Sequence, residues 1–281
     1  MIMENYEVSV VIPTLNRIET LPRALESVIN QSYKPSEIIV VDNGSSDGTL
    51  EFLGKNFPSV TILEEKKLGV SAARNKGIKH STFQWVALLD SDDEWFLNKL
   101  EAQIDVLKKP SNNYRLSHTD EVWIKNGKQL NQMKKHKKIG GDIFDKCLSI
   151  CCISPSSVLI HKSLFDELGY FDETLPVCED YDLWLKFCSK ENVHFINKKL
   201  ILKYGGHSDQ LSKAYWGMDR FRVKCIENLI FNYDLNSNQR QKAIKSLIKK
   251  IKIILNGAYK RNNSSIIVNF EKKLLFWEEQ K

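Results

Sequence analysis

Short apolar runs alternate with helix-like segments through the first hundred residues. Four runs rich in Val, Ile and Leu predict buried strands: 8–12, 37–41, 60–63 and 85–89. Between them, apolar side chains at helical spacing predict helices, as at Leu21, Leu25 and Val28 and again over 71–80. Apolar strands separated by amphipathic helices predict a parallel sheet with helices on both faces.

The pattern changes after this first region. Residues 108–140 are polar and rich in lysine, and apolar segments return beyond them. A helix is expected over 181–189, followed by two short strands before Gly205. From 214 onward, the spacing of apolar residues predicts helices to the last residue.

The composition is that of a folded globular protein. Of 281 residues, 42% are hydrophobic and 27% are charged, so disorder is not expected. The net charge of +6 includes dense lysine at 134–138 and 242–252, which permits contact with anionic partners. Few aromatic residues lie among the basic ones, and we therefore expect no nucleic acid partner.

Neither a secretory leader nor a membrane span is expected. The first seven residues contain two acidic groups and no apolar core, and no apolar run approaches the ~20 residues of a span. These observations predict a cytoplasmic protein. Its six cysteines include no C-x-x-C pair, which argues against a zinc site and favours free thiols.

The acidic group after the fourth predicted strand has the clearest chemical meaning. Asp90, Asp92, Asp93 and Glu94 crowd together, and like charges this close are unfavourable unless a cation joins them. Carboxylate oxygens are the ligands that Mg²⁺ and Mn²⁺ prefer, and Mg²⁺ often takes its other ligands from phosphates and water. Taken alone, the group fits equally well a solvated acidic turn that caps the next helix.

Two further polar residues follow predicted strands, at the edge where parallel sheets bind ligands. Asp42 ends the second strand, where it either accepts a hydrogen bond from a nucleobase or ribose or closes an Asx turn. Arg74 lies near the start of the helix after Gly69, where it faces a nucleotide or pairs with a carboxylate. The chain contains neither G-x-G-x-x-G nor G-x-x-x-x-G-K-[ST], which argues against dinucleotide-binding dehydrogenases and P-loop nucleotidases.

Four segments, in their order and spacing, resemble the family 2 glycosyltransferases of the GT-A fold: 11–17, 39–49, 69–75 and 89–93. The resemblance is close over 7–107 and looser to about residue 212. It implies an α/β nucleotide-diphospho-sugar transferase fold, with a mostly parallel central sheet, helices on both faces and a helical C-terminal extension. Residues 1–107 would then be the nucleotide-sugar-binding half of the domain, 108–212 its acceptor-binding half, and 213–281 a basic helical extension.

The resemblance also implies roles for individual residues. Those expected to bind the nucleotide-sugar are Pro13, Thr14, Asn16, Arg17, Asp42, Arg74, Asp90 and Ser91. Asp90 and Asp92 match the two acids of the DxD motif, of which the first usually faces the ribose and the second the metal. Many family members carry glutamate where this sequence has Arg17, so the resemblance leaves the role of Arg17 open.

Two later segments extend the match. Glu179 and Asp180 resemble the family's "ED" pair, in which one acid is the general base; Asp180 is the expected base and Glu179 the second choice. The alternative is that both acids stabilise the N-terminus of the next helix. His207 follows two glycines where related enzymes place a metal-ligating histidine, and a nitrogen ligand would favour Mn²⁺ over Mg²⁺.

Together these expectations describe an inverting, metal-dependent hexosyltransferase. It would move a sugar from a nucleotide-diphosphate donor, a UDP-sugar first of all, to a hydroxyl of a saccharide or lipid-linked acceptor in surface polysaccharide or lipopolysaccharide assembly. The alternatives are a phosphotransferase with Asp90 as nucleophile, a sugar nucleotidyltransferase, and a nucleotide-binding scaffold without turnover. A phosphotransferase leaves Asp42 and Arg74 unexplained. A sugar nucleotidyltransferase would need a glycine-rich loop after the first strand, which this sequence lacks.

The basic segment 239–260 has two interpretations. It carries an apolar stripe, and five lysines occupy its other faces. As a helix, it either packs on its neighbours with its lysines in solvent, or lies against the inner face of an anionic membrane, near a lipid-linked acceptor. The sequence indicates neither the acceptor nor an oligomeric state.

Overall fold

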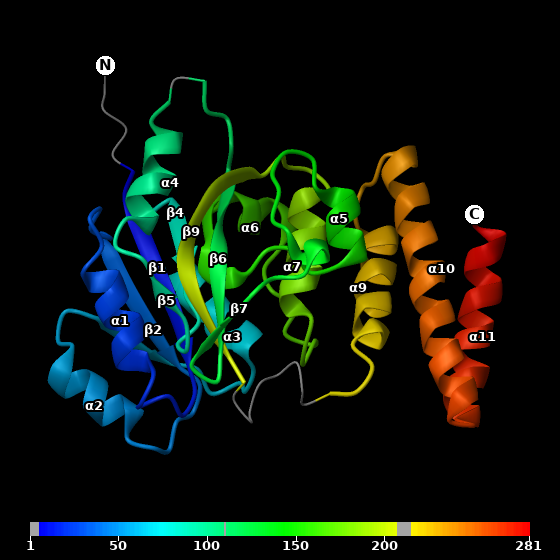
Figure 1. Ribbon diagram of the computed structural model, residues 1–281, viewed down its shortest axis with the longest axis horizontal. Coiled ribbons are helices and arrows are strands. Elements are labelled where there is room, and N and C mark those ends of the chain that lie inside the picture. Colours follow the sequence, from blue (N-terminus) through cyan, green and yellow to red (C-terminus); the bar gives the residue numbers. More distant parts are fainter. Residues whose placement is uncertain (1–5, 110, 207–214) are drawn as a thin grey trace.

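The computed structural model describes residues 6–109, 111–206 and 215–281. Its centre is a nine-stranded sheet in the order β3-β2-β1-β4-β8-β6-β9-β5, with β7 paired to β6 (Figure 1). The strands are β1 (Val8–Thr14), β2 (Glu37–Asp42), β3 (Thr61–Glu64), β4 (Trp85–Leu88), β5 (Glu94–Trp95), β6 (Leu116–Lys125), β7 (Lys128–Leu130), β8 (Val158–His161) and β9 (His194–Gly205).

Helices connect these strands and then continue alone to the end of the chain. They are α1 (Leu21–Ile29), α2 (Thr49–Asn56), α3 (Val70–His80), α4 (Lys99–Leu107), α5 (Phe144–Ser149), α6 (Ser163–Leu168), α7 (Glu179–Cys188), α9 (Asp219–Asn232), α10 (Ser237–Lys260) and α11 (Ser264–Glu279). Two short 3-10 turns, Lys134–His136 and Pro155–Ser157, lie within the second half of the sheet region.

The four strands predicted in the first hundred residues form one parallel block. Strand β1 pairs in parallel with β2 on one side and β4 on the other, and β3 extends the block beyond β2. The second half of the sheet is mixed, since β8 is antiparallel to both β4 and β6, whereas β6 and β9 are parallel. The parallel block therefore brings its carboxyl ends to one edge, as the sequence predicts.

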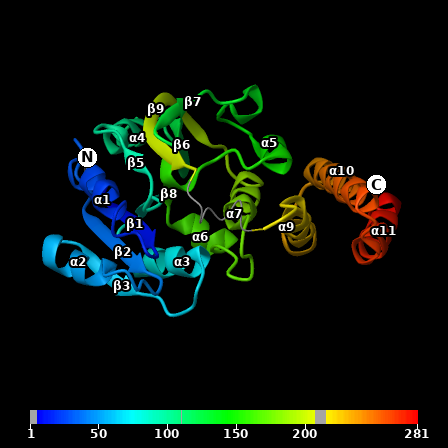
Figure 2. The ribbon, with the colours of Figure 1, turned by 60° about the horizontal axis from the view of Figure 1, so that its bottom comes forward.

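Helices cover both faces of the sheet, which also confirms the prediction. Successive residues of a strand point to opposite faces, and Val10 and Ile12 pack with α1 and α4, whereas Val11 packs with α3 and the later helices. Figure 2 shows the two layers, with α1 and α4 on one side of the strands and α3, α6 and α7 on the other. Because both faces are buried, the strands need the continuous apolar runs seen in the sequence.

One long strand stands where two short ones were expected before Gly205. Strand β9 spans twelve residues, and its pairing with β6 shifts register on both sides of Asp120. The partner residues jump from Ile196 to Lys199, so the polar stretch between them forms an irregularity within a continuous strand. The polarity that looked like a break in the sequence is therefore a bulge.

The contact between α3 and the sheet depends on Gly77. A β-carbon at Gly77 would lie 2.4 Å from Cγ1 of Val11 and 3.0 Å from Cγ2 of Val41, and both valines are fully buried. We expect Gly77→Ala to lower the free energy of unfolding by about 1–3 kcal/mol, the cost of overpacking a core.

Chemical denaturation of Gly77→Ala beside Gly54→Ala checks this expectation. Gly54 is also helical, but a β-carbon there meets nothing within 4 Å. Because alanine is the better helix former, the control should be neutral or more stable by up to about 1 kcal/mol. Equal midpoints for the two variants would show that α3 does not pack this closely on β1 and β2.

The C-terminal helices form a separate layer beyond α7, as Figures 1 and 2 show. Helix α10 begins with a capping box between Asn236 and Gln239. Helix α11 packs on this layer through the buried side chains of Phe270 and Trp277. The predicted helical extension is thus confirmed, while its division from the sheet at residues 212/213 stays a prediction. In the part of the chain that the structure describes, each helix is too short or too polar to cross a membrane.

Candidate functional site

The site begins where β1 and β2 end side by side. Thr14 and Asp42 are partners in the parallel register, and both are buried. Oδ2 of Asp42 accepts hydrogen bonds from the amides of Gly44 and Ser45, each at 3.0 Å, which is the Asx turn foreseen as one alternative. Oδ1 of Asp42 is buried without a hydrogen-bond partner among the described residues, an arrangement that calls for an explanation such as a ligand's donor.

The loop after β1 is fixed to the loop after β2. Asn16 has a φ of 52°, a conformation that asparagine tolerates better than most residues. Oδ1 of Asn16 accepts a hydrogen bond from the backbone amide of Ser46 at 2.8 Å. The backbone amide of Asn16 donates to Oγ of Ser45, also at 2.8 Å. Asn16 therefore positions the first loop, which carries Arg17 at the edge where Pro13 and Thr14 end β1.

Arg74 joins three parts of the site through a buried ion-pair network. Its Nη2 lies 2.7 Å from Oδ1 of Asp90, and its Nη1 lies 2.8 Å from Oε1 of Glu179. The Arg74 side chain is only 4% exposed, so solvent screens these pairs little. Of the two alternatives left open by the sequence, the structure shows the pairing with carboxylates.

The charges around Asp90 hold it ionised. Burial opposes ionisation, but the Arg74 guanidinium and the Lys203 ammonium outweigh it and lower the pKa of Asp90. For Glu179 the balance is reversed, because burial and the neighbouring Asp180 raise its pKa despite the ion pair with Arg74. Arg74 itself stays charged, since the two carboxylates raise its pKa against the effect of burial.

Asp92 and Asp93 differ although they are adjacent. Burial and the charge of Asp90 raise the pKa of Asp92, with Arg17 opposing. Asp93 is fully enclosed, and it accepts hydrogen bonds from Oγ of Ser156 at 2.6 Å and the amide of Tyr204 at 3.0 Å. Asp93 thus fixes the acidic loop to β9, whereas Asp92 is only partly buried and lies beside the charge of Asp90.

Glu179 and Asp180 begin α7 after a strained residue. Cys178 has a φ of 65°, which is unusual for a residue with a β-carbon and is often found at functional sites. Glu179 is buried and held by Arg74, as described above. Asp180 is partly exposed, and its Oδ2 accepts from the Cys151 thiol at 3.1 Å. All six cysteines are free thiols, as predicted.

Lys203 is a site residue that the sequence interpretation missed. It lies on β9, and its Nζ donates to Oγ of Ser154 at 3.1 Å. Burial would lower the pKa of Lys203, but the charges of Glu121, Asp93 and the other nearby acids raise it. A lysine directly after the apolar run 200–202 was a signal in the sequence, but only the register of β9 brings Lys203 beside the acidic loop.

The described residues fit part of a metal site. Across 6–109, 111–206 and 215–281, no three His, Cys, Asp or Glu side chains gather closely enough to hold a metal by themselves. Asp92, with its raised pKa and crowded acidic neighbours, suits a cation that takes its remaining ligands from phosphate and water. His207, the other expected ligand, lies outside the described residues, and Ser91 is buried within the acidic loop.

Comparison with known proteins agrees with this geometry. Residues 9–169, more than half of the chain, match the family described as "Glycosyl transferase family 2". An uncharacterized glycosyltransferase from Rickettsia bellii is 33% identical over 212 residues, which cover 73% of this chain but 31% of the relative. This chain therefore spans about a third of that relative's length.

A second relative is better covered. The Escherichia coli protein named UDP-Glc:alpha-D-GlcNAc-diphosphoundecaprenol beta-1,3-glucosyltransferase WfgD is 33% identical over 199 residues, 69% of this chain and 75% of the relative. Among solved structures, S. aureus TarS 1-349 in complex with UDP-GlcNAc superposes with a TM-score of 0.78 at 18% identity, over 96% of this chain and 81% of that one.

A more distant solved structure has the same fold. The mannosyltransferase PcManGT from Pyrobaculum calidifontis, in complex with GDP-Man and Mn²⁺, gives a TM-score of 0.60 at 14% identity, over 97% of this chain and 84% of that one. At these identities the solved structures establish the GT-A fold alone. The expected fold class is thus confirmed.

Proposed function

The chain belongs to glycosyl transferase family 2, and on that premise we propose that it transfers a sugar from a nucleotide-diphosphate donor to a hydroxyl of a saccharide or lipid-linked acceptor. The observation that carries the proposal is the network through Arg74. It links Asp90, which follows β4 on the donor side, to Glu179, which begins the acceptor-side helix beside Asp180. Donor and acceptor residues are therefore held in one rigid unit.

The proposed donor is a UDP-sugar. Asp42 offers its unpartnered Oδ1 to the base or ribose, and Pro13, Thr14, Asn16 and Arg17 form the adjoining wall. We assign Asp90 and Ser91 to the ribose and diphosphate of the donor. We assign Arg74 to positioning Asp90 through their ion pair, in addition to any direct contact with the donor. The UDP-glucose named for WfgD and the UDP-GlcNAc bound to TarS support uridine as the base.

We assign the divalent cation, Mn²⁺ or Mg²⁺, to Asp92, with His207 as the proposed second ligand. The Mn²⁺ named for PcManGT supports this assignment. When bound, the cation would neutralise charge on the departing diphosphate. Asp93 and Arg23 hold the loop for this role: Nη2 of Arg23 donates to the Asp92 carbonyl at 2.7 Å, and Asp93 anchors to Ser156 and β9.

We assign the role of general base to Asp180. Glu179 is buried in the ion pair with Arg74, whereas Asp180 is partly exposed and has no ion pair within the described chain. In the reaction, the acceptor oxygen bonds to the anomeric carbon as the bond from that carbon to the phosphate oxygen breaks. The hydroxyl proton passes to Asp180, and attack opposite the leaving diphosphate inverts the anomeric centre.

A transfer assay tests the proposal. The native protein is incubated with UDP-glucose, UDP-GlcNAc or GDP-mannose and a soluble GlcNAc-diphospholipid acceptor, and the release of nucleoside diphosphate is measured with Mn²⁺ and with EDTA. We expect acceptor-dependent release with one donor in Mn²⁺ and its loss in EDTA. Binding of a donor without release under any condition would favour the scaffold alternative, and equal release in EDTA would refute the role of the metal.

The cellular setting is part of the proposal. We place the protein in the cytoplasm, with a role in surface polysaccharide or lipopolysaccharide assembly, because WfgD is named for a lipid-linked acceptor. Three lysines of α10 form ion pairs with other described residues of the chain, which supports the packing of α10 on its neighbours. These pairs join Lys242 to Asp145, Lys250 to Asp219 and Lys252 to Glu278.

A further inference from the structure

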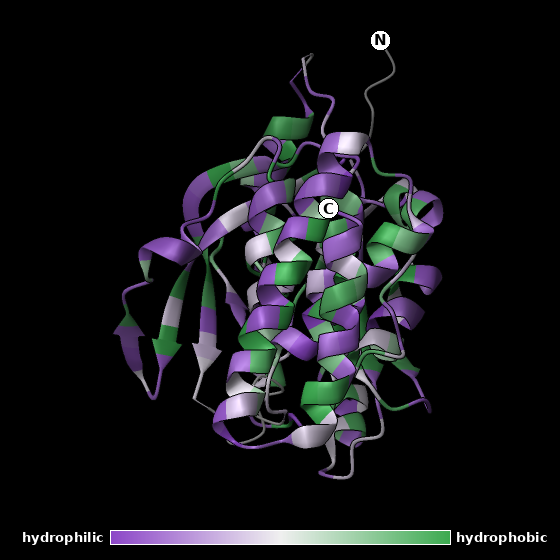
Figure 3. Cartoon of the chain, turned by 90° about the vertical axis from the view of Figure 1, so that its right-hand side faces the viewer, coloured by the Kyte–Doolittle hydropathy of each residue, from purple (hydrophilic) through white to green (hydrophobic). Residues whose placement is uncertain are grey.

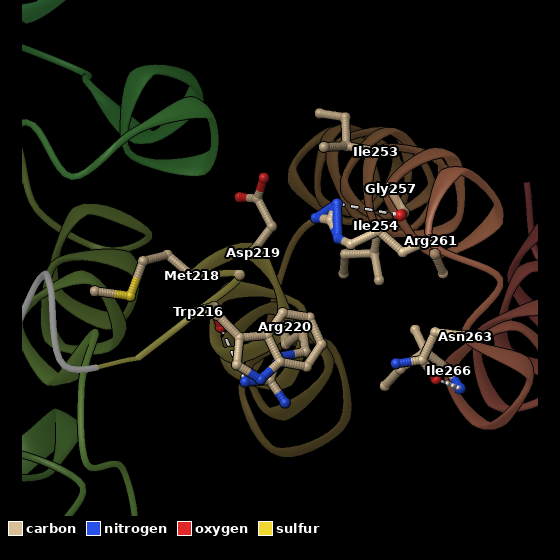
Figure 4. A pocket seen from close by; sticks show the side chains of 12 residues that line it. Trp216, Met218, Asp219, Arg220, Ile253, Ile254, Gly257, Arg261, Asn263 and Ile266 are labelled. Carbon is tan, nitrogen blue, oxygen red and sulfur yellow. Dashed lines mark hydrogen bonds between the residues drawn. The ribbon is translucent and has the colours of Figure 1, made fainter.

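A second cavity lies apart from the acidic loop, between the start of α9 and the turn from α10 to α11 (Figure 4). Its volume is about 200 Å³. Aliphatic side chains of Ile253, Ile254 and Ile266 line it together with Trp216, and two guanidinium groups, those of Arg220 and Arg261, stand at its wall. Such a lining suits a ligand that is mostly apolar and carries negative charge.

The cavity adjoins the acceptor side of the site. Met218, one of its lining residues, accepts a hydrogen bond on its carbonyl from the Cys178 thiol at 3.9 Å, and Cys178 immediately precedes Glu179 and Asp180. Lys250, on the neighbouring helix α10, pairs with Asp219 of the cavity wall at 3.4 Å. In Figure 1 the turn from α10 to α11 lies at the same end of the molecule as the carboxyl end of β9.

Among the described residues, the two guanidinium groups contact an aromatic ring and backbone carbonyls. Arg220 lies over the ring of Trp216 at 3.6 Å and donates through Nη2 to the Trp216 carbonyl at 2.9 Å, while its Nε is buried without a partner among the described residues. Arg261 donates to the Gly257 carbonyl at 3.2 Å. Within the described ranges neither forms an ion pair with a carboxylate, and arginine is well suited to bind phosphate.

The apolar side chains at this place are also unusually accessible. Trp216 is 56% exposed and Ile253 is 51% exposed, although both face the cavity. Figure 3 looks onto α10 and α11 from the outside and shows hydrophobic segments among hydrophilic ones along both helices. Asp219 and Asn263 add polar groups to the lining, but most of the lining is apolar. A hydrocarbon chain would therefore bury more of this surface than a saccharide would.

We propose that this cavity binds the lipid diphosphate end of the acceptor, with the first isoprenoid units against Ile253, Ile254 and Ile266 and the diphosphate beside Arg220 and Arg261. This inference rests on the proposed function, since it concerns the lipid-linked acceptor of that reaction. The position beside Cys178 places the acceptor's sugar toward Asp180 and its lipid chain toward α10 and α11.

Calorimetric titration with farnesyl diphosphate tests the proposal. UDP and Mn²⁺ are kept at saturation so that the probe's diphosphate cannot occupy the donor site. Farnesol and inorganic diphosphate serve as probes with only the chain or only the charge. We expect farnesyl diphosphate to bind at least tenfold more tightly than either part, because the apolar and charged contacts act together.

Matched variants locate the binding. Ile253→Asp places a charge at the cavity, whereas Val268→Asp places one at an equally accessible position of α11, 54% exposed, outside the cavity lining. We expect about tenfold weaker binding of farnesyl diphosphate in Ile253→Asp and in Arg220→Gln, and native binding in Val268→Asp. Arg220→Gln keeps the test valid if Ile253→Asp is unstable.

Three results would overturn the inference. They are equal affinity in Ile253→Asp, Arg220→Gln and Val268→Asp, binding of inorganic diphosphate as tight as that of farnesyl diphosphate, or a dimer in sedimentation that Ile253→Asp dissociates. The last result would assign the cavity to a second copy of the chain. UDP release from UDP-glucose is measured in the same proteins to separate the two proposals. If the native protein releases no UDP, the proposed function is refuted. If it releases UDP but does not bind farnesyl diphosphate, only the role of the cavity is refuted.

Discussion

Asp180→Asn is expected to lower kcat roughly 100- to 10,000-fold, the contribution of a positioned general base. An amide cannot accept the proton of the acceptor hydroxyl, but it preserves the size of the side chain and its hydrogen bond from the Cys151 thiol, which lies 3.1 Å from Oδ2. Binding of the donor should be unaffected, because the donor is assigned to other residues. Steady-state kinetics with varied donor and varied acceptor would show a loss of kcat at unchanged KM for the donor.

Glu179→Gln is the matched control for this prediction. Glu179 is the neighbouring acid, but it is held at 2.8 Å by the buried Arg74, so its loss should act through stability and donor binding. We therefore expect Glu179→Gln to keep much more of the native kcat than Asp180→Asn does. A larger loss of kcat in Glu179→Gln than in Asp180→Asn, with both proteins folded, would exchange the roles of the two acids.

Arg74→Met is expected to lower the free energy of unfolding by about 3–5 kcal/mol, because it leaves the buried Glu179 and the partly buried Asp90 without their partner. Methionine fills much of the arginine's volume but offers no donor to Asp90 or Glu179. The matched control is Arg115→Met. Arg115 also bridges two carboxylates, those of Glu167 and Glu191, but at 32% exposure, where solvent screens the pairs and the loss should be much smaller.

The cost of Arg74→Met should depend on pH. In the native protein Arg74 helps to lower the pKa of Asp90, so this stabilisation is present above the unfolded value of about 3.9 and is lost as the pH falls through the folded value. In the variant, buried Asp90 and Glu179 would take up protons at higher pH and so lose their unfavourable charge. Denaturation curves at pH 7 and pH 4 should therefore show a smaller difference at pH 4, and a difference that grew toward acid would contradict the ion-pair account.

The sheet edge could be predicted from the sequence because its information is local. Each parallel strand is a continuous apolar run, and Asp42 and Asp90 each follow such a run directly. Once the strands are parallel and adjacent, these residues must lie at one edge. The choice between the two roles of Arg74 was not local, because Glu179 lies 105 residues away.

The second half of the site could not be predicted for the same reason. Lys203 reaches the acidic loop through the pairing of β9 with β6 and β5, and that pairing includes a bulge which looked like a break between strands. The enclosure of Asp93 depends on Ser156 and Tyr204, which come from distant segments. The sequence shows where the acidic residues of this loop lie. Only the long-range contacts determine which of them the protein itself fixes by hydrogen bonds or ion pairs.

Calorimetric titration of UDP tests the central claim, that the edge carrying Asp42, Asp90 and Asp92 is a nucleotide-diphosphate site. Native protein and Asp92→Asn are titrated with UDP in Mn²⁺ and in EDTA, and GDP, dTDP and CMP are run beside them. The account predicts Mn²⁺-dependent binding of one nucleoside diphosphate, weakened at least tenfold in Asp92→Asn. Binding of none of these nucleotides, or unchanged Mn²⁺-dependent binding in Asp92→Asn, would contradict it.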